Sequence, residues 1–181
     1  MSGPEAADAG HGPFTASRER FESVLGFLGN ADAAALSHAE LEERLDADGR
    51  ALLRQLFSDH LQLRALREPR VTVVAADGSA RPRVEGGHTR VLATVFGDVE
   101  VRRNAYRSPG QANLHPADAV LNLPEERHSH GLRRLAAVES SRGSFDDAVH
   151  AIARATGQQL GKRQTEQLTT RAAADFDAFY A

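Results

Sequence analysis

The sequence predicts an α+β protein with N-terminal helices, a small antiparallel β-meander and a C-terminal three-helix, helix-turn-helix-like unit. Apolar residues recur at helical spacing before residue 70 and again after residue 127. Between these regions, residues 71–106 alternate apolar and polar side chains around glycine-containing turns, as antiparallel strands do. The chain has 181 residues, of which 41% are hydrophobic, so it can form one domain or two small ones.

Changes in composition divide the chain into five predicted segments. Gly, Ala and Pro dominate its start without any period, which is typical of a disordered tail. The segment after the predicted strands contains three prolines and has little periodicity. The predicted segments are a disordered tail at 1–13, a helical region at 14–69, the antiparallel β-meander at 70–107, a Pro-containing linker at 108–126 and a helix-turn-helix-like DNA-binding region at 127–181.

The helical region is predicted to hold three helices. Apolar residues from Phe21 to Leu28 lie on one face of the first helix, which should end near Gly29. Ser37 and Glu40 have the spacing of a capping box and should open a short second helix through Leu45. A longer amphipathic helix is expected over residues 51–67. The simplest interpretation of this region is a helical bundle or a dimerisation element.

The middle of the chain is predicted to form three or four short strands over residues 71–106. Phe96-Gly97-Asp98 is the expected turn of the main hairpin. Four arginines, Arg90, Arg102, Arg103 and Arg107, lie on or beside these strands. Two interpretations stay open for them: a solvated outer face, or a β-ribbon that contacts phosphates.

Helix signals are clearest in the last third of the chain. Ser129 should cap a helix in which Leu132, Leu135 and Ala136 are buried, while Arg133 and Arg134 point away from them. Ser144 with Asp147 should cap the next helix, and Gly157 should end it. The last helix is expected to start near Gly161 or Lys162 and to bury Leu168, Ala172, Phe176 and Phe179. Three helices with a tight middle break are typical of a helix-turn-helix.

The distribution of charge favours DNA binding by this last third. Residues 127–171 contain 8 basic and 4 acidic residues, a net of +4, although the whole chain has a net charge of −3. A helix N-terminus attracts phosphate through its free N–H groups. Arg pairs with guanine and Gln with adenine in the major groove. The candidate DNA-binding residues are Lys162, Arg163, Gln164, Gln167, Arg133, Arg134, Arg142 and Ser144.

Other chemistries find little support in the sequence. The chain has no Cys, which excludes disulfides, thiolate catalysis and Cys-ligated zinc. No apolar run is long enough for a membrane span and no export signal is visible, so a cytoplasmic, membrane-free protein is expected. His128 and His130 would point apart on a helix and are better explained as residues at a helix start than as metal ligands. No catalytic residue, metal or cofactor is predicted.

Three long blocks of the chain resemble the N-terminal half of ISKra-type insertion-sequence transposases. The blocks are "ATVFGDVEVRRNAYRSPG", "NLHPADAVLNLPEERHSHGLRRLAAVESSRGSFDDAV" and "ATGQQLGKRQTEQLTTRAAADFDAFY", and the resemblance extends over about residues 50–181. It implies recognition of double-stranded DNA at the terminal repeats of an element. In that family a ribonuclease-H-like domain follows, whose Asp-Asp-Glu set holds two divalent metals. The chain stops about where that domain would begin, so we expect a truncated transposase that is no enzyme by itself.

Two other functions remain as alternatives. The first is a helical dimerisation or protein-interaction module without direct DNA binding, which would use residues 51–67. The second is a small metal-dependent or hydrolytic enzyme. A homo-oligomer is expected for the DNA-binding protein as well.

Overall fold

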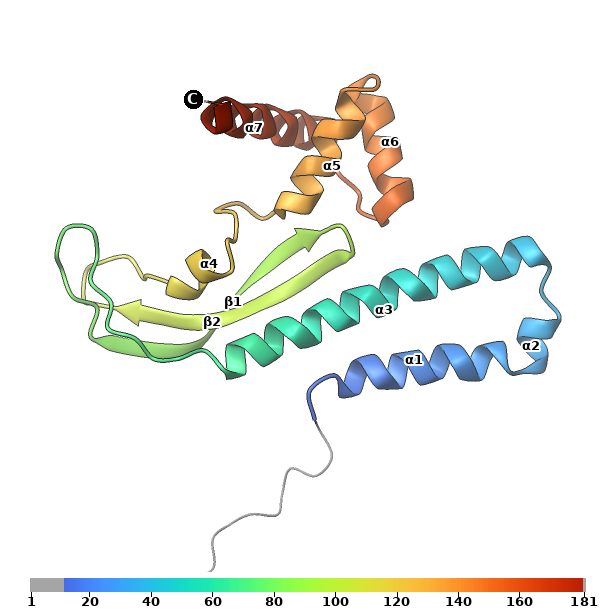
Figure 1. Ribbon diagram of the computed structural model, residues 1–181, viewed down its shortest axis with the longest axis horizontal. Coiled ribbons are helices and arrows are strands. Elements are labelled where there is room, and N and C mark those ends of the chain that lie inside the picture. Colours follow the sequence, from blue (N-terminus) through green and yellow to red (C-terminus); the bar gives the residue numbers. More distant parts are fainter. Residues whose placement is uncertain (1–11, 181) are drawn as a thin grey trace, which may run out of the picture. The chain divides into compact units, whose positions relative to one another are not determined.

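The computed structural model describes residues 12–180, and the side chains of residues 12–174 (Figure 1). Most of the predicted tail, and the expected burial of Phe176 and Phe179, therefore lie outside the described part. The chain is α+β, as predicted. It forms two compact units, and the boundary along the chain falls between Leu66 and Arg67. In order, the elements are α1 Thr15–Leu28, α2 Ala31–Ala34, α3 His38–Leu66, β1 Arg83–Thr94, β2 Gly97–Arg107, α4 Pro116–Val120, α5 His130–Ser140, α6 Phe145–Thr156 and α7 Lys162–Tyr180.

The first unit is a helical hairpin in which α1 packs against α3. Its main polar contact is the buried carboxylate of Asp59 on α3. Asp59 Oδ2 accepts hydrogen bonds from the backbone N–H (3.1 Å) and the hydroxyl (2.6 Å) of Ser17 on α1. Gln55 donates to the other oxygen of the same carboxylate at 2.8 Å. A buried carboxylate needs such donors, so this contact fixes which face of α1 meets α3.

The predicted break between a short and a long helix is wrong, because α3 is one helix of 29 residues. Gly49 lies within it, and a glycine costs only about 1 kcal/mol in a helix interior. Ion pairs at i, i+4 spacing surround this position: Arg44 pairs with Asp48 at 2.7 Å just before the glycine, and Asp46 pairs with Arg50 across it. Such pairs favour the helix on both sides of the glycine.

The capping box that opens α3 is confirmed. The Ser37 backbone N–H and hydroxyl donate to Glu40 Oε2 at 2.8 and 2.6 Å, and the Glu40 N–H donates back to Ser37 Oγ at 3.4 Å. These hydrogen bonds hold the pKa of the Glu40 carboxyl below its usual range.

Large apolar side chains remain exposed on both long helices of this unit. On α1 they are Phe21, Leu25 and Leu28, and on α3 they are Leu45, Leu53, Leu56 and Leu66. Each is between 37% and 78% exposed. The described residues of the hairpin thus bury little apolar surface of their own.

The second unit begins with a β-hairpin of β1 and β2 rather than a meander. The prediction of three or four strands is wrong, because the described residues form a two-stranded sheet and only an isolated bridge joins Val74 to Ala80. The "VTVV" segment instead supports the end of the hairpin, where the Val71 N–H donates to the Tyr106 hydroxyl at 2.9 Å. The turn lies at residues 95–96, one residue earlier than expected, since Thr94 pairs with Gly97.

The tip of the hairpin shares one apolar core with the three C-terminal helices. Backbone hydrogen bonds hold Ala93 of β1 to the segment before α5, from Ala93 N to Arg127 O and from Ser129 N to Ala93 O, both at 2.8 Å. The short helix α4 lies within the segment that was predicted as a linker. The buried core consists of Ala93, Leu132, Ala136, Ile152, Leu160 and Leu168.

The predicted ends of the C-terminal helices are confirmed. Ser129 Oγ accepts the Leu132 N–H at 3.1 Å, and Ser144 and Asp147 form a complete capping box. Gly157 ends α6 with a φ of 71°, in the left-handed region that favours glycine. The last helix begins at Lys162.

Candidate nucleic-acid interface

The last helix, α7, turns one face into the core and the other to solvent. Thr165 and Leu168 are buried. The opposite face lines a shallow depression, which is formed by Arg163, Glu166, Gln167, Thr170 and Arg171. Helical spacing places Arg163, Gln167 and Arg171 one turn apart along this face. We call these five residues the outer face of α7.

Two of the predicted residues at the start of α7 serve to build the helix. The Gln164 side chain accepts the Gly161 N–H at 3.0 Å, so it caps the helix on which it lies. Lys162 Nζ lies 2.7 Å from Asp146 Oδ2 in the first turn of α6. This ion pair ties the starts of α6 and α7 together, and it offsets part of the positive charge at this point.

The outer face is held in place by contacts of Thr169 with α5. The Thr169 hydroxyl lies 3.0 Å from Ser140 Oγ and 3.5 Å from the Ala136 carbonyl, both on α5, and it also lies 2.9 Å from the Thr165 carbonyl within α7. With Leu168 in the core beside it, this polar contact sets the rotation of α7 about its axis. The rotation decides which side chains reach solvent.

The predicted phosphate contacts on α5 and α6 have different surroundings. Arg134 is exposed and has no hydrogen bond or ion pair with another described residue. Arg142 is also exposed, and its guanidinium lies 2.8 Å from Glu139. The Ser144 hydroxyl donates to Asp147 in the capping box. The negative charges of Asp146 and Asp147 beside it disfavour phosphate.

The expectation that Arg133 points away from the apolar stripe is wrong, because this side chain is buried. Its guanidinium lies 3.1 Å from His130 Nδ1 and 3.8 Å from Glu126 Oε2. Buried arginines need such acceptors, and the acidic residue that supplies one lies before α5 in the sequence. Spacing within α5 alone therefore predicts the wrong direction for Arg133.

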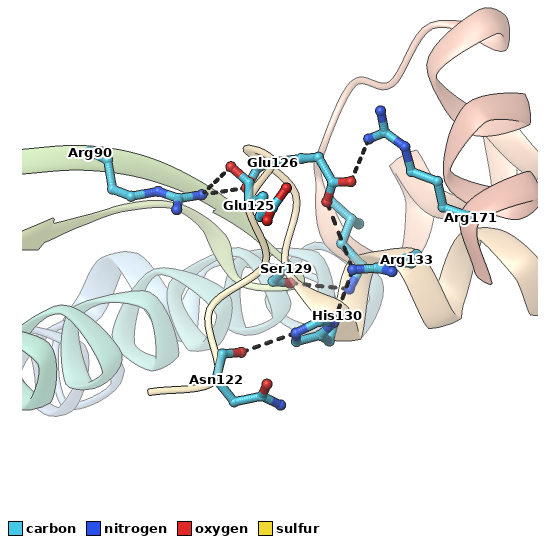
Figure 2. A network of polar contacts seen from close by, with 9 residues as sticks. Arg90, Asn122, Glu125, Glu126, Ser129, His130, Arg133 and Arg171 are labelled. Carbon is cyan, nitrogen blue, oxygen red and sulfur yellow. Dashed lines mark hydrogen bonds and ion pairs between the residues drawn. The ribbon is translucent and has the colours of Figure 1, made fainter. Parts of the chain in front are cut away.

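Glu126 is the centre of a polar network that joins β1, α5 and α7 (Figure 2). Its carboxylate lies between Arg133 of α5 and Arg171 of α7, with Arg171 Nη1 at 3.0 Å. Arg90 of β1 reaches the backbone carbonyls of Glu125 and Glu126. The network thus fixes α7 to the hairpin. Arg171 was not predicted as a site residue, although its spacing of eight from Arg163 could have found it.

His128 and Asp98 lie where the hairpin tip meets this segment. Burial lowers the pKa of His128, and the nearby positive charges of Arg127 and Arg171 add to the effect. For Asp98, burial favours a higher pKa, but hydrogen bonds from Gln158 and Arg127 outweigh it and lower the pKa. His130 is bonded differently, with its Nε2 3.0 Å from the Asn122 carbonyl.

Most arginines of the hairpin are already paired. Arg103 is buried with its Nε 2.6 Å from Asp118 Oδ1, and Arg107 pairs with Glu85. Arg90 is held by the carbonyls described above. Of the four arginines noted in the sequence, Arg102 is the exposed one that has no ion pair within the described chain. This arrangement does not favour a phosphate-contacting ribbon.

Within residues 12–180, no cluster of three His, Cys, Asp or Glu side chains is placed to hold a metal ion. Across the same residues, no helix has the length and apolarity that a membrane crossing requires. The chain matches no protein-family model, and it matches none of the curated proteins.

Proposed function

We propose that this chain is a DNA-binding module that reads duplex DNA with the outer face of α7. The proposal rests mainly on Arg163 and Gln167, which are exposed one turn apart on a helix held firmly by the core. Neither side chain has a hydrogen bond or an ion pair within the described residues. Two exposed, unpaired polar side chains on a helix packed against the core suit recognition of an external partner.

Base recognition follows from the chemistry of these two side chains. An α-helix fits the major groove, where Arg donates two hydrogen bonds to guanine and Gln exchanges two with adenine. Each such contact is worth roughly 1–3 kcal/mol of discrimination against a wrong base. Glu166 on the same face can accept from the amino group of cytosine, so its charge is compatible with this role.

The remaining positive charge would hold the DNA backbone. Arg134 is unpaired and can contact a phosphate, whereas Arg142 and Arg171 would have to exchange their ion pairs with Glu139 and Glu126 for one. Phosphate contacts position a protein without reading sequence. The other predicted contacts enter the proposal differently. Arg133, Gln164 and Ser144 shape the helices, and Lys162 shares its charge with Asp146.

The biological role is proposed from the sequence resemblance alone. We propose that the module recognises the ends of an insertion sequence for a transposase. The terminal repeats of such an element are then the natural duplexes to test. DNA binding by α7 can be tested without knowing that sequence, because phosphate contacts produce binding to any duplex.

The test compares two variants of α7 with a matched control. Arg163→Ala and Gln167→Ala are titrated against a fluorescent duplex at low salt, and binding is followed by anisotropy. We expect Arg163→Ala to weaken binding to the preferred duplex by roughly 1–3 kcal/mol and to relax the preference for guanine at one position, because it removes a base contact. Gln167→Ala should mainly reduce the preference among sequences.

The control is Arg54→Ala on α3, which removes the same charge from an exposed position of the other unit. It should bind as the parent does. Equal affinities for the parent, Arg163→Ala and Gln167→Ala would contradict the proposal. Circular dichroism of each variant verifies that the helices are intact.

A further inference from the structure

The backbone groups on the outer edge of β2, the one turned away from β1, have no hydrogen-bond partner among the described residues at the centre of the strand. Ala93 directs its N–H and C=O away from β2, to Arg127 and Ser129. Its partner Asp98 must then also direct its backbone groups away from β1, since bonded and non-bonded pairs alternate in an antiparallel ladder. The same alternation places the backbone groups of Glu100 and Arg102 on the outer edge.

Two contacts further along β2 agree with this assignment. The Asn104 N–H donates outward to Glu68 Oε2 at 2.8 Å, and Tyr106 pairs outward with Leu114 at 2.8 and 3.0 Å. These contacts close the far end of the edge. No hydrogen bond from the described residues reaches the outward backbone groups of Glu100 and Arg102.

We propose that a second copy of this chain pairs with the open edge, with β2 lying antiparallel to β2 about a twofold axis at Val101. In this register Glu100 lies opposite Arg102 of the second copy, and Arg102 lies opposite its Glu100. Both are outward residues, so each such pair exchanges backbone hydrogen bonds as well. The two hairpins thereby become one four-stranded sheet. A larger sheet is favoured because a two-stranded sheet by itself is only marginally stable.

The charges on the edge select this register and this partner. A twofold axis at Glu100 would place two glutamates face to face, and an axis at Arg102 would do the same with two arginines. Only the axis at Val101 gives opposite charges at both positions. Glu100 and Arg102 are exposed, and neither has an ion pair within the described chain.

The apolar face of the sheet is compatible with the same register. Val99 and Val101 are buried on the face opposite to Glu100 and Arg102. The axis would set Val101 beside Val101 of the second copy, so the apolar face continues across the pair. This inference does not depend on DNA binding.

The test is a charge exchange across the proposed axis in the full chain. Glu100→Arg carries two arginines on the edge, and Arg102→Glu carries two glutamates, so each variant alone should repel itself. We expect the parent to dimerise in sedimentation equilibrium. The dimer dissociation constant of each single variant should be at least about tenfold higher than that of the parent. An equimolar mixture should recover dimers that contain one chain of each variant, which native mass spectrometry separates by mass.

Leu56→Asp on α3 is the control for an alternative dimer through the exposed apolar residues, and it should leave association unchanged. The proposal is overturned if the parent stays monomeric, if the single variants dimerise as the parent does, or if the mixture fails to recover. Loss of association in Leu56→Asp alone would place the interface on the helices instead. Circular dichroism shows that each variant keeps its fold, since both side chains are exposed.

Discussion

Asp59 is the residue on which the packing of α1 against α3 depends most. Its buried carboxylate accepts two hydrogen bonds from Ser17 and one from Gln55. An acidic residue at this position is expected to be exposed, because Asp is rarely buried without partners. The partner is 42 residues away in the sequence. Local spacing therefore could not predict this contact.

Asp59→Ala should destabilise the helical hairpin by about 1–3 kcal/mol, because it leaves buried donors of Ser17 and Gln55 without an acceptor. Asp59→Asn should cost less, since the amide oxygen can still accept one of these bonds. Urea unfolding followed by circular dichroism measures both. Equal stability of Asp59→Ala and the parent would show that the contact contributes nothing.

His128 gives the second unit a dependence on pH. Its pKa is lowered in the folded chain by burial and by nearby arginines. As the pH falls, the unfolded chain therefore takes up a proton at this residue before the folded chain does. The stability from neutral His128 is complete above its unfolded pKa of about 6.5 and is lost as the pH falls toward the folded pKa. Melting temperatures between pH 7.5 and 5 should thus fall less for His128→Asn than for the parent. His150→Asn, at an exposed position on α6, should follow the parent, and a parallel decline for His128→Asn would refute this role.

At the scale of elements, helix ends were predictable and helix interiors less so. Ser37, Ser129 and Ser144 all cap helices as their spacing indicates, because a cap is a contact within four residues. The direction of Arg133 was not predictable from α5, because it depends on Glu126, which lies before that helix. The continuity of α3 was missed because Gly49 suggests a break, although the spacing of Asp46 and Arg50 across it supports one helix. Likewise, alternation predicted strands but not how many would pair.

Two glycines in different backbone conformations should respond in opposite ways to alanine. Gly157→Ala places a side chain at a φ of 71° and should destabilise the second unit by roughly 1–2 kcal/mol. Gly49→Ala lies within α3, with nothing within 4 Å of the added carbon, and should stabilise the first unit by about 1 kcal/mol. Thermal unfolding of both variants measures the two effects. The same sign for both would contradict the assigned conformations.

For the whole molecule, the sequence predicted the class and the order of parts, and the structure adds which surfaces are available. The α+β class is confirmed. Of the eight predicted DNA contacts, Arg163, Gln167 and Arg134 are exposed and have no partner in the described chain. Charge and helical spacing selected a helix, α7, whose outer face is exposed. They could not show that Arg133 is needed for packing, because its contact with Glu126 forms only in the folded unit. The capping role of Ser144 was visible in the sequence, although the same residue was also predicted to contact phosphate.

The salt dependence of duplex binding by the unmodified chain tests DNA recognition most directly. A fluorescent duplex carrying a candidate terminal repeat is titrated against a scrambled duplex over a series of salt concentrations. The account predicts tighter binding to the repeat, with log K falling linearly as log salt rises, because phosphate contacts release counterions. Absence of binding to either duplex, or binding that salt leaves unchanged, would contradict the assignment of α7 as a DNA-reading helix.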